Sequence, residues 1–137
     1  DDSQYNIIAM SRHINEIINN NLWDTVIMLY EHLALNGYLM IPVKNYLSAK
    51  EIYKFLSIGS NNKPFFDIES YNYVNIERFI DMLEKNILGI KYKVVKVAND
   101  NDIVDRVNNA MVNMGISVDD ITYNTLRMEM AWFVIER

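Results

Sequence analysis

The sequence contains no cysteine and only four glycines among its 137 residues. The lack of cysteine excludes disulfides, thiolate metal ligands and a cysteine nucleophile, and it is typical of a reducing compartment. Four glycines are too few to favour a phosphate-binding loop, and neither such a loop nor a nucleophile-elbow motif occurs. The longest apolar run, Met130–Ile135, is far below the roughly 18 residues of a membrane span. We therefore expect a soluble, intracellular chain with no membrane partner and no cofactor.

The composition indicates a folded protein with an uneven distribution of charge. Half of the residues are apolar and 12% are aromatic, which is ample for a packed core. The net charge is −5, yet residues 44–96 carry nine basic and six acidic side chains, whereas the segment on either side has a surplus of four acids. The middle third is therefore locally basic, although far less so than an ordinary nucleic-acid-binding domain.

Apolar residues recur at helical spacing in the first third of the chain. Amphipathic patterns cover about 4–19 and 21–36, and three asparagines join them. The pair Asn36-Gly37 that follows is suited to a left-handed helix end. Two helices with so short a joint predict an antiparallel helical hairpin.

Capping signals predict further helices along the chain. Ser48 with Glu51, and Ser117 with Asp120, form the same capping box at two helix starts. Other helices are predicted from Asn75 and over about 102–114, and the apolar run to Ile135 predicts a final buried helix. The predicted hairpins cover about 4–37, 46–89 with an inserted loop at 60–74, 91–115, and an incomplete last one at 117–137.

The stretch from Ile90 to Val97 allows a second interpretation. Ile90, Tyr92 and Val94 alternate with lysines, and this spacing of two residues suits a β-strand. The predicted fold class is therefore all-α, antiparallel helical hairpins stacked as a short α-solenoid. The alternative is a single α+β domain with a minor strand at 90–97.

The segment Gly115–Leu126, with Met111 four residues before it, carries a more specific pattern. Its glycine and isoleucine, two acids and Ile-Thr-Tyr-Asn-Thr-Leu run resembles the junction between two pentatricopeptide repeats. Tyrosines also open short apolar runs at Tyr5, Tyr46 and Tyr92. The resemblance implies a non-enzymatic helical-repeat protein of organellar RNA metabolism. It would contact single-stranded RNA or dock on a protein of an RNA-handling complex, in an organelle such as the mitochondrion, with any targeting segment outside this chain.

The resemblance also implies which side chains would meet RNA. Base-reading positions fall at Val94, Asp120 and Thr125, although Val94 offers no hydrogen bond. Phosphate contacts would fall to Lys50, Lys54, Lys91, Lys93 and Lys96. Taken alone, the same residues also suit a plainer interpretation as solvated lysines and a helix-capping acid.

No group of residues predicts catalysis or metal binding. His13 and Glu16 lie one helical turn apart, but two potential ligands do not make a metal site. His32, beside Glu31 near a predicted helix end, suits a contact with the helix dipole better than a role as catalytic base. The alternative function is a small intracellular protein-binding module, such as an inhibitor or immunity protein, whose acidic surface covers a basic partner.

Overall fold

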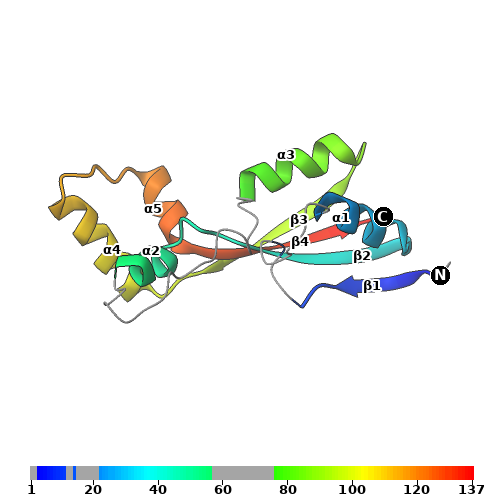
Figure 1. Ribbon diagram of the computed structural model, residues 1–137, viewed down its shortest axis with the longest axis horizontal. Helices are drawn as coiled ribbons and strands as arrows, with labels where there is room; N and C mark the ends of the chain where they lie inside the picture. Colours follow the sequence, from blue (N-terminus) through cyan, green and yellow to red (C-terminus); the bar gives the residue numbers. More distant parts are fainter. Residues whose placement is uncertain (1–2, 12–13, 15–21, 57–75) are drawn as a thin grey trace.

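The computed structural model describes residues 3–11, 14, 22–56 and 76–137. The predicted loop at 60–74, together with His13 and Glu16, lies outside the described residues. Helices and strands are interspersed along the chain (Figure 1). In chain order they are β1 (Tyr5–Ala9), α1 (Leu22–Glu31), β2 (Leu33–Lys44), α2 (Ala49–Leu56), α3 (Ile76–Asn86), β3 (Lys91–Ala98), α4 (Asn101–Asn113), α5 (Asp120–Arg127) and β4 (Met128–Glu136).

The strands form one mixed sheet in the order β1-β2-β4-β3. Strand β1 pairs with β2 in parallel, and β4 runs antiparallel to both β2 and β3. Strands β1, β2 and β3 therefore share one direction, and β4 lies between β2 and β3 in the opposite one. The predicted all-α solenoid is wrong, and the fold is α/β.

One face of the sheet carries the main core. Helices α1 and α3 both lie on this face (Figure 1) and bury it. The Phe79 ring of α3 packs edge-on against Phe133 of β4, with the ring centres 4.6 Å apart, and stacks on Trp23 of α1 at 5.3 Å. A second, smaller core joins α2, α4 and α5 beyond one end of the strands, with Ala49, Val104, Val107 and Leu126 buried.

The first predicted hairpin is replaced by a strand, a helix and a second strand. Residues 5–9, expected at a helix start, form β1, and the helix predicted over 21–36 ends at Glu31. Asn36 does adopt the left-handed conformation, with φ of 64°, but within β2. At Gly37 a Cβ atom would meet the carbonyl oxygens of Ala34 at 2.8 Å and of Asn6 and Tyr5 at 3.0 Å. The Asn-Gly pair therefore shapes a close approach of β1 and β2 and ends no helix.

The apolar run near the C-terminal end is also a strand. Residues 130–136 alternate between half-buried and buried side chains, with Ala131, Phe133 and Ile135 fully buried toward α1 and α3. An apolar run of this length suits a central strand as well as a buried helix, so its hydrophobicity alone does not separate the two.

Several predicted elements are present. Helices α2, α3 and α4 occupy the places that capping and amphipathic spacing predict, and the alternative strand at 90–97 is present as β3. The Ser48 hydroxyl accepts the Glu51 backbone N–H at 3.3 Å, as a capping box requires. The start predicted at Ser117 is wrong, because Asp119 caps α5 and accepts the Thr122 backbone N–H at 2.7 Å.

Candidate functional site

The three strands that run in one direction, β1, β2 and β3, have their carboxyl ends along the same edge of the sheet, which lies across the strands. There β2 ends at Lys44 and is followed by Asn45, and β3 ends at Ala98 and is followed by Asn99. In open α/β sheets, ligands bind in the crevice beyond the carboxyl ends of such strands. This edge is therefore where a binding site is expected.

Two buried asparagines organise this edge. The Asn45 side-chain amide donates to the carbonyls of Thr125 at 2.9 Å and Met128 at 2.7 Å, and its backbone N–H donates to Glu129 at 3.1 Å. The Asn99 side-chain amide donates to Leu126 at 2.8 Å, and its backbone N–H donates to Arg127 at 2.6 Å. The carbonyls of residues 125–129, where α5 turns into β4, are thus all held by the two asparagines that follow β2 and β3.

A cleft of about 590 Å³ opens beside this junction. Its walls are mostly apolar, and its polar groups come from separate elements: Asn45 after β2, Glu77 on α3, Lys96 on β3 and Thr125 on α5. The apolar lining consists of Leu47, Ile76, Ile80, Val94 and Met128. A mainly apolar pocket with a few convergent polar groups is the usual form of a small-molecule site.

The cleft has charges of opposite sign on different walls. Glu77 stands in the first turn of α3, where the helix dipole favours a carboxylate. Lys96 lies on β3 and also lines a shallower pocket of about 280 Å³ whose other charged side chain is Arg127. A bound molecule can therefore meet the Glu77 carboxylate, a hydrogen-bond acceptor, on one side and the Lys96 ammonium on the other.

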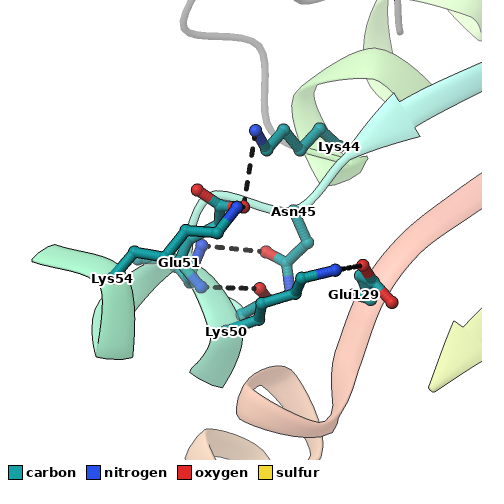
Figure 2. Close-up of polar contacts among 8 residues, drawn as sticks. Lys44, Asn45, Lys50, Glu51, Lys54 and Glu129 are labelled. Atoms are coloured by element: carbon teal, nitrogen blue, oxygen red, sulfur yellow. Dashed lines mark hydrogen bonds and ion pairs between the residues drawn. The ribbon is translucent and has the colours of Figure 1, made fainter. Parts of the chain in front are cut away.

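Ion pairs hold α2 next to this edge (Figure 2). The Glu51 carboxylate is only 6% exposed and lies 3.4 Å from the ammonium groups of both Lys44 and Lys54. Lys50 donates to Glu129 at 2.6 Å, and this hydrogen bond raises the pKa of Lys50 against the opposing effect of burial. Figure 2 shows both contacts reaching from α2 toward the ends of β2 and β4, so they fix the helix beside the cleft.

The structure brings together three of the residues predicted to bind RNA. Val94, Lys96 and Thr125 all line the cleft, although they come from different elements. Lys91 and Lys93 project from the opposite face of β3, because side chains alternate along a strand.

The remaining predicted residues lie away from the cleft lining. Lys50 and Lys54 are engaged in the ion pairs of α2, and Asp120 is exposed in the first turn of α5. Binding of RNA by these eight residues stays a prediction from the sequence.

The sequence interpretation missed the residues that shape the edge. Asn45, Asn99 and Glu77 were not singled out, and the only available signal was an asparagine directly after an apolar strand. His32 is placed near the end of α1, with its Nδ1 2.8 Å from the Met28 carbonyl. In the part of the chain that the structure describes, no three His, Asp or Glu side chains gather as metal ligands, and no helix is long and apolar enough to cross a membrane.

The fold is similar to that of S-adenosylmethionine (SAM)-dependent methyltransferases. One solved structure, a SAM-dependent methyltransferase from Archaeoglobus fulgidus, matches 98% of this chain and 60% of its own, with a TM-score of 0.52 and 12% identity. The plantazolicin methyltransferase BamL, solved with a triazolic desmethylPZN analog and SAH, matches 98% of this chain and 54% of its own, with a TM-score of 0.55 and 15% identity. The chain thus spans little more than half the length of these neighbours.

Comparison by sequence finds no family model that matches and no similar curated protein. At these identities the structural likeness establishes the fold. It overturns the pentatricopeptide resemblance, because the neighbours have a mixed sheet with helices and no helical repeat. The prediction of a non-enzymatic protein, either an RNA-metabolism factor or an inhibitor-like module, is corrected on the same ground, since both neighbours are enzymes by name.

The cofactor named by these neighbours does not fit the described residues. A nucleotide-type cofactor at this edge is commonly received by a glycine-rich turn directly after a strand, where the backbone can come close. The described glycines lie within β2, before β3 and after α4. Asn45 and Asn99 follow β2 and β3 instead, and their amides already hold residues 125–129. The cleft at this edge therefore suits a different molecule.

Proposed function

We propose that this chain forms the acceptor-binding part of a SAM-dependent methyltransferase. The observation that carries the proposal is the cleft of about 590 Å³, which opens at the carboxyl ends of the parallel strands in a methyltransferase-like sheet. SAM is then bound by the part of the fold that the two neighbours have and residues 1–137 do not span.

The lining of the cleft defines the kind of acceptor that it fits. Five apolar side chains bury the body of the molecule, while the Thr125 hydroxyl, which donates to the Ile121 carbonyl, can accept a hydrogen bond from it. The Glu77 carboxylate can take a proton from an O–H or N–H group of the molecule that receives the methyl group. The Lys96 ammonium can bind an anionic group of the same molecule. We therefore propose a small, largely apolar acceptor with one ionisable or anionic group.

Methyl transfer can be measured directly with SAM carrying a tritiated methyl group. The native protein that contains residues 1–137 is incubated with panels of small aromatic acids, short peptides and RNA, and the label in each product is counted. We expect transfer to the small acids. Glu77→Gln and Lys96→Met should each lower kcat/KM about tenfold or more, equivalent to roughly 1.4 kcal/mol of transition-state stabilisation.

Matched variants on nearby surfaces control for general damage. Asp81→Asn removes an exposed acid one turn further along α3, and Lys93→Met removes a lysine from the opposite face of β3. Both should leave the rate within about twofold, because neither side chain lines the cleft. Absence of transfer to every class of acceptor, or equal losses in all four variants, would refute the proposal.

A further inference from the structure

The two outer strands of the sheet, β1 and β3, differ in chemistry. Strand β3, at one edge, carries three exposed lysines at positions 91, 93 and 96. Strand β1, at the other, reads Tyr-Asn-Ile-Ile-Ala and has neither a charged residue nor a proline. Natural sheets use lysine and proline to keep exposed edges from pairing with other strands. By this rule β3 is built as an outer edge, and β1 is not.

Among the described residues, no strand pairs with the outer side of β1. The Met10 backbone N–H donates to the Met40 carbonyl of β2 at 3.0 Å. Because N–H groups alternate in direction along a strand, those of Ile7 and Ala9 point away from β2. The register of Ile7, Ile8 and Ala9 with residues 38–40 is regular, so the alternation holds over this stretch. Ile7 and Ala9 can thus donate to a further strand.

The face of the sheet away from α3 also carries exposed apolar side chains. Tyr38 and Val95, on this face, are 43% and 53% exposed, and Ile7, which also lines a hollow beside α1, is 65% exposed. In the middle of this face the strand register places half-buried Met40 beside half-buried Val134, and buried Pro42 beside half-buried Trp132, so the exposed part lies around Ile7, Tyr38 and Val95. Exposed apolar side chains grouped on one face of a sheet are typical of a contact with another element.

An apolar hollow adjoins the same edge. It has a volume of about 340 Å³ and is lined by Tyr5, Ile7 and Ile8 of β1, by Met28 and Leu29 of α1, and by His32. The hollow continues the unpaired edge onto the side covered by α1. A strand laid along β1 would place alternate side chains into it.

We infer that β1 is an internal strand of a larger sheet. A further strand from outside residues 1–137 pairs with β1, and helices that accompany it cover the open apolar face. Doubly wound sheets carry helices on both faces, and in the part of the chain that the structure describes α1 and α3 pack on one face. The two solved neighbours also have additional chain beyond the part that matches. A second copy pairing edge to edge would leave the open face of each copy uncovered, so it fits less well.

Amide hydrogen exchange, resolved to single residues, tests the pairing in the native protein. The amides of Ile7 and Ala9 should be protected about 100-fold or more relative to an unstructured chain, at any protein concentration. Exchange at the unstructured rate would overturn the inference. Protection that is lost on dilution would show that a second copy occupies the edge, which contradicts the proposed occupant.

A pair of substitutions tests the open face independently. Ile7→Lys places a charge where the inference puts a buried contact, and it should lower the Tm of the native protein by about 5 °C or more. Leu88→Lys, at a side chain 97% exposed in the turn before β3, is the matched control and should leave the Tm within about 1 °C. Equal Tm values for the two variants would contradict the inference. These readouts do not depend on methyl transfer, so either proposal can fail without the other.

Discussion

Asn45 and Asn99 hold the same stretch of backbone from two different strands. Together they donate to the carbonyls of residues 125–129, with Asn45 binding both ends of that stretch and Asn99 binding its middle. The junction of α5 and β4 is thereby fixed against β2 and β3, and this junction forms one wall of the cleft. The position of Thr125 and Met128 in the cleft depends on these two side chains.

Replacing Asn45 should therefore destabilise the protein strongly. In Asn45→Leu the carbonyls of Thr125 and Met128 lose a donor in a buried position, which costs about 2–4 kcal/mol. Urea unfolding measures this loss. Asn109→Leu, at an exposed position on α4, serves as control and should change the free energy of unfolding by less than about 0.5 kcal/mol. Similar values for both variants would remove Asn45 from the account.

The ion pairs of α2 should contribute unequally. Glu51 is buried between two lysines, so Glu51→Ala should cost about 2–3 kcal/mol because Lys44, which is only 21% exposed, loses its partner carboxylate. Lys50→Met should cost less than about 1 kcal/mol, because Lys50 and Glu129 are both about one-third or more exposed and water screens their attraction. Chemical denaturation of the two variants distinguishes these values, and the reverse order would contradict the structure.

Gly37 should tolerate no larger side chain. A Cβ atom there meets three backbone carbonyl oxygens at 2.8–3.0 Å, and backbone cannot move aside without separating β1 from β2. We expect Gly37→Ala to destabilise the protein by about 1–3 kcal/mol. Leu35→Ala, at a side chain 80% exposed in the same strand, should have little effect on the measured Tm.

Asp119 should stabilise α5 in a pH-dependent manner. Hydrogen bonds from Thr122 lower the pKa of the Asp119 carboxyl below its ordinary value of 3.8. The ionised form is thus favoured in the folded state, so the stabilisation is present above about pH 4 and is lost as the pH falls through the folded-state pKa. The difference in unfolding free energy between the native protein and Asp119→Ala should become smaller as the pH is lowered from about 5 to about 3, because the Asp119 carboxylate becomes protonated. A difference that stays constant over this interval would contradict the capping role.

Local signals in the sequence predicted some elements and not the sheet. The alternation of Tyr92 and Val94 with lysines identified β3, and amphipathic spacing identified α3 and α4. The apolar residues of β2 and β4 have no such alternation of polar side chains, because one face packs on α1 and α3 and the other carries Met40, Trp132 and Val134. Runs of this kind do not distinguish a buried helix from a strand.

The tyrosine pattern misled for a related reason. Tyr5 and Tyr92 lie on strands at opposite edges of the sheet, and Tyr123 lies on α5, so their surroundings share nothing. At the site, Val94, Lys96 and Thr125 were selected on the resemblance, and their meeting in one cleft depends on a topology that the resemblance did not contain. Asn45 was beyond sequence reasoning, because its partners lie 80 and 83 residues away.

The central claim is that the cleft beside Asn45 binds the methyl acceptor and not the cofactor. Lys96→Trp fills the cleft from an exposed position on β3, and Lys85→Trp adds the same ring to an exposed position on α3 outside the lining. Steady-state kinetics of the native protein should show the KM for the acceptor raised about tenfold or more in Lys96→Trp alone, with the KM for SAM within about twofold. A rise in the KM for SAM, or no change in either constant, would contradict the account.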